Sequence, residues 1–316
     1  MPPKPPSDLP TNPIGILLRE PWIEKFSSIE KVMAKLLPLG FTYFELPQKH
    51  YFSEGEITFL RELKKKRNIS YTIHSSSPCG LINLTNPNYV NFEVRLEQLF
   101  EFARRLGAEL INFDLDSCYK DELVWERQPD LCLKRTYQTL VSRVNLLLNY
   151  SREYGIAVAL ENADVRDPKR FNIIRLGMVA EDFLKILRDC PDIRLTLDTG
   201  HLYLAARWFG FDLFKDFLVP LAPFIIHTHF SSNFGRDDGT GFKDYHKGIG
   251  DLHLPLQEGT LPWGEIVDFL LQQNYPGAFL LEIKPENNRK TLSEILRAVE
   301  VSFNLLKERI AAFVST

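Results

Sequence analysis

The sequence has few of the features that mark membrane, secreted or nucleic-acid-binding proteins. No stretch of its 316 residues approaches 18 consecutive apolar side chains, so we expect no membrane-spanning segment. Its four cysteines, Cys79, Cys118, Cys132 and Cys190, form no C-x-x-C pair and predict reduced thiols. The formal net charge is -3, and the one dense basic run covers residues 64–67. A nucleic-acid partner is therefore not expected, because binding a phosphate backbone requires a basic face.

The N-terminal segment differs in composition from the rest of the chain. Residues 1–13 are rich in proline and polar side chains and lack the apolar segment of a signal peptide. We expect them to form a flexible tail on a cytoplasmic protein. The whole chain is 44% hydrophobic and 25% charged, which supplies ample material for a core. Its length fits one large α/β barrel or two ordinary domains, and nothing in it indicates an oligomeric state.

Short apolar segments alternate with amphipathic segments along the chain. Strands are predicted over residues 14–18, 42–46, 70–74, 109–114, 156–161, 193–198, 224–229 and 279–284. Helices are predicted over residues 28–37, 56–66, 91–106, 133–154, 179–188, 214–221, 265–274 and 291–310. Eight regular β-then-α units favour a single-domain α/β fold, a (β/α)8 TIM barrel over residues 14–316. The competitor is a doubly wound sheet, but no G-x-G-x-x-G follows the first strand.

The predicted strands end in side chains that can bind a metal or move a proton. In a TIM barrel these ends meet at the active site. The end residues are Glu45, His74, Asp114, Glu161, Asp198 with His201, His229, and Glu282 with Lys284. Alternation along the fifth strand places Ala157, Ala159 and Glu161 on the inner face. After the sixth strand, a turn is predicted at Gly200, although a capping role for Asp198 is equally compatible with the sequence. Residues 230–263 form the longest interruption and predict a functional loop.

Several of these segments together resemble one family. They are Leu160-Glu-Asn162, Leu197-Asp-Thr-Gly-His201, His227-Thr-His229, residues 251–259 and Leu281-Glu282. The pattern resembles that of the xylose isomerase-like TIM barrels. That family groups sugar and sugar-phosphate isomerases and epimerases with zinc-dependent abasic-site endonucleases of the endonuclease IV type. The resemblance extends from about residue 14 to residue 310.

Resemblance to the ketose 3-epimerases implies a metal site and a reaction. It assigns Glu161, Asp198, His229 and Glu282 as ligands of one divalent metal, with the two glutamates acting also as acid and base on a sugar, sugar phosphate or related polyol. Carboxylates with one imidazole suit Mn²⁺, Mg²⁺, Co²⁺ or Zn²⁺. The alternative is a hydrogen-bonded polar cluster without metal. Further substrate-binding candidates are His74, His201, Arg236, His253 and Lys284.

The resemblance to the nucleases implies additional zinc ligands. His74, His201, Asp251 and His253 occupy matching positions, and the last three suit a second metal. Asp114 stands where those nucleases have a histidine.

A third possibility is a barrel that binds metal or sugar without turnover. Two further residues are assigned less specifically: His227 is expected to be packed and hydrogen-bonded, and Glu45 to be either a pocket acid or an arginine partner.

Overall fold

The computed structural model describes most of the chain. The described residues are 12–48, 52–75, 92–115, 117–119, 128–167, 173–285 and 290–315. The tail predicted over residues 1–13 lies almost wholly outside them, as do Cys79 and the side chain of Cys118. Cys132 and Cys190 are buried thiols. None of the helices in the described ranges is long and apolar enough to span a membrane.

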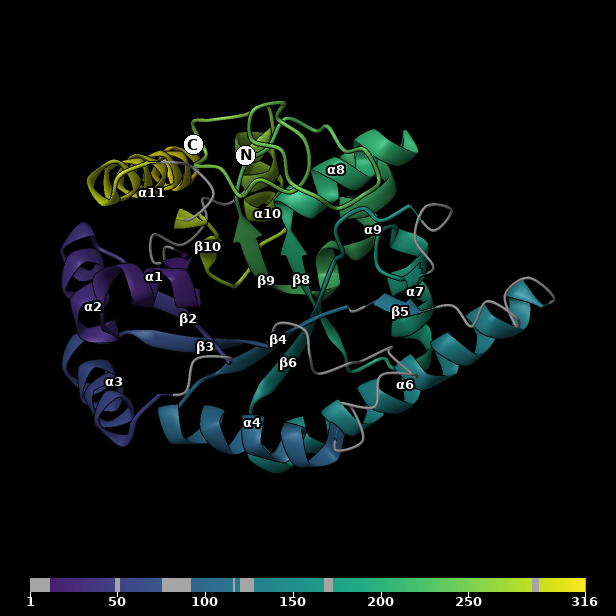
Figure 1. Cartoon of the computed structure of the whole chain (residues 1–316), viewed down its shortest axis with the longest axis horizontal. Coiled ribbons are helices and arrows are strands. Elements are labelled where there is room, and N and C mark those ends of the chain that lie inside the picture. The colour runs from purple at the N-terminus through teal and green to yellow at the C-terminus, as the bar shows by residue number, and fades with distance from the viewer. Residues whose placement is uncertain are drawn as a thin grey trace, which may run out of the picture.

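Eight parallel strands close into a barrel in the order β1-β10-β9-β8-β6-β4-β3-β2 (Figure 1). The strands are β1 (Ile14–Leu17), β2 (Tyr43–Pro47), β3 (Ser70–Ser75), β4 (Leu110–Asp114), β6 (Ala157–Glu161), β8 (Arg194–Asp198), β9 (Ile225–Phe230) and β10 (Phe279–Leu281). Each corresponds to a predicted strand, so the barrel expected from the sequence is confirmed. The eighth strand is shorter than predicted, because the backbone leaves the sheet after Leu281.

Helices surround the barrel. They are α1 (Glu20–Phe26), α2 (Ile29–Leu36), α3 (Glu54–Arg67), α4 (Phe92–Leu106), α6 (Pro129–Tyr154), α7 (Ala180–Asp189), α8 (Thr199–Phe209), α9 (Val219–Leu221), α10 (Trp263–Gln272) and α11 (Leu292–Val314). Side-chain caps begin several of them. Ser53 and Thr291 form capping boxes with Glu56 and Glu294, which satisfy backbone N–H groups that have no partner within the helix.

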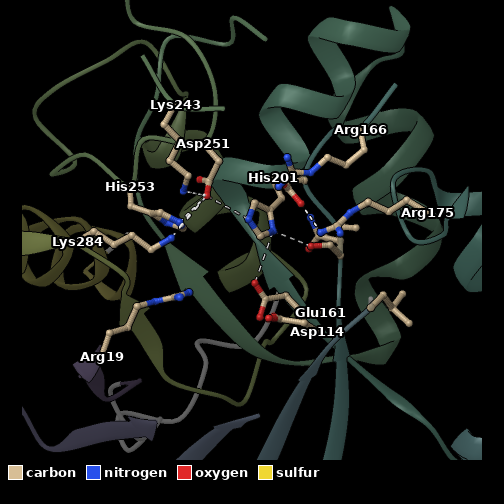
Figure 2. Close-up of a pocket in the computed structure, with 14 residues that line it drawn as sticks. Arg19, Asp114, Glu161, Arg166, Arg175, His201, Lys243, Asp251, His253 and Lys284 are labelled. Carbon is tan, nitrogen blue, oxygen red and sulfur yellow. Dashed lines mark hydrogen bonds and ion pairs between the residues drawn. The ribbon is translucent and has the colours of Figure 1, made fainter. Parts of the chain in front are cut away.

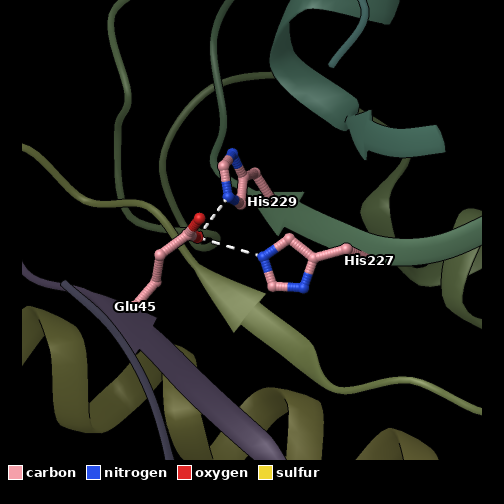
Figure 3. Close-up of side chains that lie close together, drawn as sticks. All are labelled: Glu45, His227 and His229. Carbon is pink, nitrogen blue, oxygen red and sulfur yellow. Dashed lines mark hydrogen bonds and ion pairs between the residues drawn. The ribbon is translucent and has the colours of Figure 1, made fainter. Parts of the chain in front are cut away.

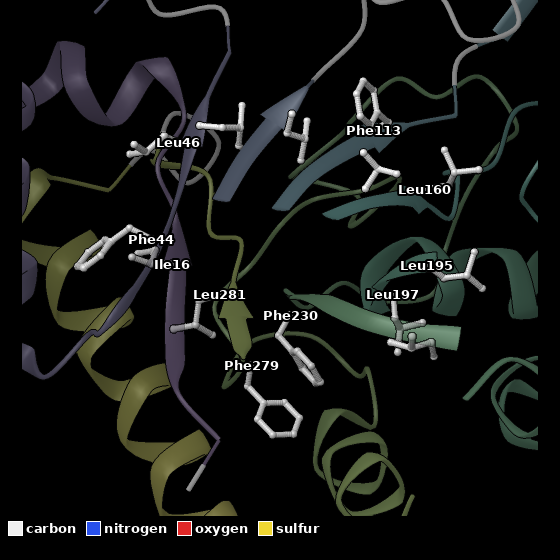
Figure 4. Close-up of a cluster of buried hydrophobic side chains, with 14 of the residues drawn as sticks. Ile16, Phe44, Leu46, Phe113, Leu160, Leu195, Leu197, Phe230, Phe279 and Leu281 are labelled. Atoms are coloured by element: carbon white, nitrogen blue, oxygen red, sulfur yellow. The ribbon is translucent and has the colours of Figure 1, made fainter. Parts of the chain in front are cut away.

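The core lies between the outer faces of the strands and the helices. Ile16, Phe44, Leu160 and Phe230 belong to one continuous cluster of buried side chains, part of which is drawn in Figure 4. Alternation along the strands turns these residues outward and leaves the inner face to polar side chains. Truncation of a side chain such as Leu160 to alanine would cost about 2–5 kcal/mol of unfolding free energy.

The first two strands approach each other closely at Gly15. A Cβ at this position would lie 2.7 Å from the carbonyl oxygen of Tyr43 and 2.9 Å from the Tyr43 Cβ. Only glycine therefore fits there without moving a strand.

The region after β8 differs from the predicted turn. Asp198 is the N-cap of α8, and its Oδ1 accepts a hydrogen bond of 2.7 Å from the His201 backbone N–H. Gly200 is thus helical, and the predicted turn is wrong. The first helix after the strand is α8, because the capping carboxylate starts a helix at once. The predicted helix over residues 214–221 instead comprises a π-helical segment, Leu213–Leu218, followed by α9.

A long loop connects β9 to α10, as predicted. It folds back on itself through isolated bridges between Ser232 and Leu254 and between Asp244 and Ile249. In Figure 1 this green loop lies over the ends to which the arrows of β8 and β9 point. The loop therefore places its own side chains at the carboxyl end of the barrel.

A small antiparallel sheet of β5 (Ser117–Tyr119) and β7 (Ile173–Arg175) lies outside the barrel.

Candidate active site

Four polar residues come together at the carboxyl ends of four adjacent strands. Glu161 ends β6, Asp198 ends β8, His229 lies near the end of β9, and Glu282 follows β10. All four are at least 99% buried. One ligand atom from each lies within 4.8 Å of the others. We call this set the four-residue cluster. These are the four residues that the resemblance to the ketose 3-epimerases implies as metal ligands.

Three carboxylates surround Nδ1 of His229. Glu161 Oε2 lies 3.3 Å from this atom, Glu282 Oε2 3.2 Å and Asp198 Oδ2 4.0 Å. Among the described residues, Asp198 Oδ2, Glu282 Oε2 and His229 Nδ1 have no hydrogen-bond partner. Buried polar atoms without partners are uncommon in folded proteins, and carboxylate and imidazole donors suit a divalent cation. The donor set fits a metal ion at this point.

The ionisation of the cluster supports the same conclusion. Burial raises the pKa of Asp198 well above its usual value, and the charges of Glu282 and Glu161 raise it further. Burial lowers the pKa of His229, but the charges of Glu161 and Glu45 outweigh it and raise that pKa well above its usual value. Without a cation the cluster therefore holds extra protons. A divalent cation would replace them and balance the carboxylates.

A further carboxylate orients the imidazole of His229. Glu45 Oε2 lies 2.6 Å from His229 Nε2 and 3.0 Å from His227 Nε2 (Figure 3). A carboxylate at Nε2 leaves Nδ1 directed at the other three carboxylates. Glu45 therefore pairs with two histidines, and neither role considered from the sequence describes it fully. His227 is buried and hydrogen-bonded, which confirms its prediction.

Two asparagines hold two of the acidic residues in place, one through the backbone of Asp198 and one through the side chain of Glu161. The Asn162 side chain donates to the Asp198 carbonyl oxygen at 2.9 Å and accepts from the Asp198 backbone N–H at 2.7 Å. These bonds join the ends of β6 and β8. Asn112 Nδ2 donates to Glu161 Oε2 at 2.5 Å. Asn112 points into the barrel from β4, and the inward alternation of that strand was the signal that could have identified it.

A second group of possible metal ligands lies above the first. His201, Asp251 and His253 also offer ligand atoms within 4.8 Å of one another. His201 Nδ1 lies 2.8 Å from the Asn162 carbonyl oxygen and must donate to it, while His201 Nε2 faces Asp251 Oδ2 at 3.6 Å. Burial lowers the pKa of His253 to about 3, so its imidazole is neutral.

The backbone at His253 is unusual. Its φ of 45° lies in the left-handed region, which non-glycine residues adopt uncommonly. The loop holds this conformation through the bridge between Ser232 and Leu254.

The other predicted residues lie at different places around the site. His74 Nε2 lies 3.5 Å from Glu161 Oε2 and 3.6 Å from Asp114 Oδ1. The ring of His74 stacks on that of His229 at 5.5 Å between centroids. Asp114 and Lys284 line the cavity, whereas Arg236 is exposed and is not among its lining residues.

A cavity of about 170 Å³ adjoins the four-residue cluster, and one member of the cluster, Glu161, lines it (Figure 2). Ligand pockets commonly measure about 300–1,000 Å³, so this cavity suits a small molecule. Five charged lining residues were not identified from the sequence: Arg19, Asp164, Arg166, Arg175 and Lys243. Arg19 follows β1 by two residues and forms an ion pair with Glu282 Oε1. The strand-end rule applied to the first strand would have found it. Asp164, Arg166 and Lys243 lie in connecting segments, and Arg175 ends β7 of the small sheet outside the barrel.

Similarity to known proteins supports the fold described above. A curated protein of Methanocaldococcus jannaschii, the uncharacterized protein MJ1311, is 25% identical over 294 residues, which cover 90% of this chain and 88% of that protein. Solved structures include a D-tagatose 3-epimerase-like protein, with a TM-score of 0.65 and 21% identity over 94% of this chain and 99% of that one. Another is the IOLI protein with a binding zinc atom, with a TM-score of 0.68 and 14% identity over 93% of this chain and 98% of that one.

A family model provides the assignment. The model described as the xylose isomerase-like TIM barrel matches residues 33–301, which include all four members of the four-residue cluster. The chain therefore belongs to the xylose isomerase-like TIM barrel family.

Proposed function

We propose that the protein is a divalent-metal-dependent isomerase or epimerase of a small sugar or related polyol. The observation that carries the proposal is the convergence of Glu161, Asp198 and Glu282 on Nδ1 of His229 beside a small cavity that Glu161 lines. The similar structures of a D-tagatose 3-epimerase-like protein and of the IOLI protein with a binding zinc atom support it. The cation would be Mn²⁺, Mg²⁺, Co²⁺ or Zn²⁺.

A bound cation would withdraw electron density from adjacent oxygens of a hydroxy-carbonyl substrate and so make the neighbouring C–H bond more acidic. Glu161 and Glu282 lie on β6 and after β10, with the strands β8 and β9 between them. One glutamate accepts the proton from carbon, and the other, entering as the carboxylic acid, returns a proton to the opposite face. The two glutamates exchange protonation states in each turnover, and proton exchange with water resets them.

Neighbouring residues prepare these two glutamates. The guanidinium of Arg19 pairs with Glu282 Oε1, and Asn112 holds Glu161 Oε2. Burial raises the pKa of Glu282, but the charge of Arg19 and the hydrogen bond with His229 outweigh it and bring that pKa well below its usual value. Glu282 is therefore an ionised carboxylate before a substrate binds. His201 extends into the cavity and supplies a hydrogen-bonding group to a substrate oxygen.

The experiment that tests this proposal is solvent hydrogen exchange. Metal-loaded protein is incubated in D₂O with a panel of ketoses, their phosphates and inososes, and the C–H signals are followed by NMR. The expected result is deuterium incorporation into one substrate class, reduced by about 10²–10⁴-fold in Glu161→Gln and Glu282→Gln. Absence of exchange and of isomer formation on the whole panel would overturn the proposal.

A second candidate is zinc-dependent hydrolysis of abasic DNA. The observation in its favour is the additional group of His201, Asp251 and His253, together with His74 beside Glu161. A net charge of -3 weighs against a nucleic-acid substrate. Elemental analysis of the purified protein distinguishes the two: one metal per chain supports the isomerase, and two or three zinc ions with cleavage of abasic DNA support the nuclease. A barrel that binds without turnover would retain metal and sugar but exchange no hydrogen.

A further inference from the structure

The inner face of the barrel remains polar below the four-residue cluster. Alternation along a strand places the residue two positions before each strand-end side chain on the same inner face. In β3, β4 and β8 these residues are Thr72, Asn112 and Thr196. Glu45 of β2 points into the same part of the barrel, where its Oε2 contacts two histidines (Figure 3). All four side chains belong to residues that are at least 99% buried, so bulk water does not reach them.

Each of these side chains has a polar atom that lacks a hydrogen-bond partner among the described residues. The atoms are Glu45 Oε1, Thr72 Oγ1, Asn112 Oδ1 and Thr196 Oγ1. Nearly all buried polar groups in folded proteins are hydrogen-bonded, either to protein atoms or to internal water. Four such atoms in one part of the barrel therefore indicate a bound polar species that they share.

The register of the strands places these side chains close to one another. Thr72 is the cross-strand neighbour of Glu45, and Thr196 is the cross-strand neighbour of Glu161. Asn112 also reaches Glu161, because its Nδ2 lies 2.5 Å from Glu161 Oε2. One layer of a TIM barrel holds only about four side chains, so the two pairs lie across a narrow interior.

Water fits the hydrogen-bonding capacity of these four atoms better than a cation does. The Glu45 carboxylate and Asn112 Oδ1 accept hydrogen bonds, whereas the hydroxyl groups of Thr72 and Thr196 can donate them. Water donates and accepts, so it can satisfy both kinds of atom. A cation would bind the hydroxyl oxygens and leave their hydrogens without acceptors. Ala159 adds only a methyl group to the inner face of β6, which leaves room for water.

We propose that ordered water occupies the barrel interior beneath the four-residue cluster and hydrogen-bonds to the four unpartnered atoms. It donates to the two acceptors, Glu45 Oε1 and Asn112 Oδ1. It accepts from the hydroxyl groups of Thr72 and Thr196. The site lies on the opposite side of the cluster from the loop after β9, within the closed barrel.

This water supports two members of the four-residue cluster from beneath. A donor at Asn112 Oδ1 keeps the amide nitrogen turned toward Glu161 Oε2, to which it donates. A donor at Glu45 Oε1 leaves Oε2 of the same carboxylate to the imidazole of His229. The two threonines are thus positioning residues that act through the water. Their effect on metal binding rests on the proposed function, whereas the water site does not.

Crystallography at a resolution that shows ordered water tests the site directly. Wild-type crystals are compared without metal, with Mn²⁺, and after soaking in Tl⁺, whose anomalous signal marks sites for monovalent cations. We expect water within hydrogen-bonding distance of Glu45 Oε1 and Asn112 Oδ1 in all three, and no Tl⁺ there. A Tl⁺ peak at these atoms would replace the water by a cation. Absence of ordered density beside all four atoms would overturn the proposal.

Replacement of each threonine by valine tests the hydrogen bonds, because valine has a similar shape but cannot donate. The matched control is Thr136→Val on α6, outside the barrel, where the hydroxyl is also buried and lacks a partner within the described ranges. Removal of a hydroxyl without a partner should leave stability unchanged or raise it. We expect Thr72→Val and Thr196→Val, but not the control, to unfold at lower denaturant concentration than the wild type. Equal behaviour of all three variants would show that the two barrel hydroxyls contact no water.

Mn²⁺ titration of the same variants tests the link to the cluster. We expect affinity to fall roughly threefold to tenfold in Thr72→Val and Thr196→Val, less than the about 10–100-fold typical of groups that touch a ligating histidine. Thr136→Val should bind Mn²⁺ as the wild type does. Equal affinity in all variants would remove the positioning role of the threonines. Ordered water in a protein that binds no divalent metal would keep the water site and remove the metal-dependent isomerase.

Discussion

The carboxylate of Glu45 lies 2.6 Å from Nε2 of His229, while Nδ1 of the same ring faces the carboxylates of the four-residue cluster. This contact fixes the ring orientation and raises its basicity toward a cation. Burial raises the pKa of Glu45, but the charges of His229 and His227 outweigh it and bring that pKa well below its usual value. Glu45 is therefore an ionised partner that acts on the metal site through His229.

The first prediction concerns the loss of this charge. Glu45→Gln retains the shape and an acceptor oxygen but removes the negative charge beside His229. We expect metal affinity to fall about 10–100-fold, because partners of ligating histidines typically contribute that much. Mn²⁺ titration measures the change. The control is Glu109→Gln. Glu109 lies just before β4, its side chain is half-exposed, and its carboxylate pairs with Lys64. Equal Mn²⁺ affinity in the wild type and Glu45→Gln would show that Glu45 only fills space.

The sequence predicted the barrel and the centre of the site because both follow from local patterns. Alternation places Glu161 inward and Leu160 outward on β6, and the parallel arrangement brings the ends of the strands together. Contacts that depend on the packing of distant segments are not encoded in this way. Glu45 and His227 are 182 residues apart, and no spacing rule connects them.

The contacts of Lys243 and Arg166 were beyond prediction for a similar reason. Lys243 meets Asp251 only because the long loop after β9 folds back through paired backbone groups. Arg166 reaches that loop from another segment, at the Thr240 carbonyl. Gly200 illustrates the opposite difficulty, since glycine suggested a turn locally while the capping carboxylate of Asp198 began a helix.

The second prediction concerns metal removal. Chelation leaves three buried carboxylates facing one imidazole, so the metal-free protein should be less stable. At a free Mn²⁺ concentration 100 times Kd, binding would add about 2.7 kcal/mol to the free energy of unfolding. Calorimetry of chelator-treated protein with and without Mn²⁺ measures the difference in Tm. Asp198→Asn is the matched variant, because asparagine is an equally good N-cap for α8 but a weaker metal ligand. We expect it to fold and to show a smaller rise in Tm, and an equal rise would remove Asp198 from the ligand set.

The third prediction concerns Gly200 in the first turn of α8. A Cβ there would lie 2.8 Å from Ser231 Oγ and 3.2 Å from Asp198 Oδ1. Gly200→Ala should therefore displace Asp198 and lower the free energy of unfolding by about 1–3 kcal/mol. Denaturant unfolding and Mn²⁺ titration measure the two effects. The control is Gly55→Ala in the first turn of α3, where the nearest atom is Ser53 Oγ at 3.9 Å. There we expect a gain of about 0.4–1 kcal/mol. Equal stability of both variants would contradict the close packing at Gly200.

The fourth prediction concerns pH and the loop after β9. Burial raises the pKa of Asp237 from 3.8 to about 6, while its Oδ1 accepts a hydrogen bond of 2.6 Å from the Gly239 backbone N–H. Because the folded state holds this proton more tightly than the unfolded state, ionisation of Asp237 destabilises the fold. The penalty is absent below about pH 4 and complete above about pH 6. Partial exposure to solvent reduces its size.

Asp237→Asn keeps the acceptor oxygen and removes the charge. We expect a higher Tm than that of the wild type at pH 7.5, with a difference that shrinks between pH 6 and pH 4 and then vanishes. Asp244→Asn, in the same loop, should behave in the opposite way. The backbone N–H of Lys247 holds the pKa of Asp244 below its usual value, so its charge stabilises the fold at neutral pH. Loss of that charge should lower Tm at pH 7.5, and the difference should vanish as pH falls. A lower Tm for Asp237→Asn at pH 7.5 would mean that its carboxylate is stabilised in the fold, and the burial of Asp237 would then not govern its ionisation.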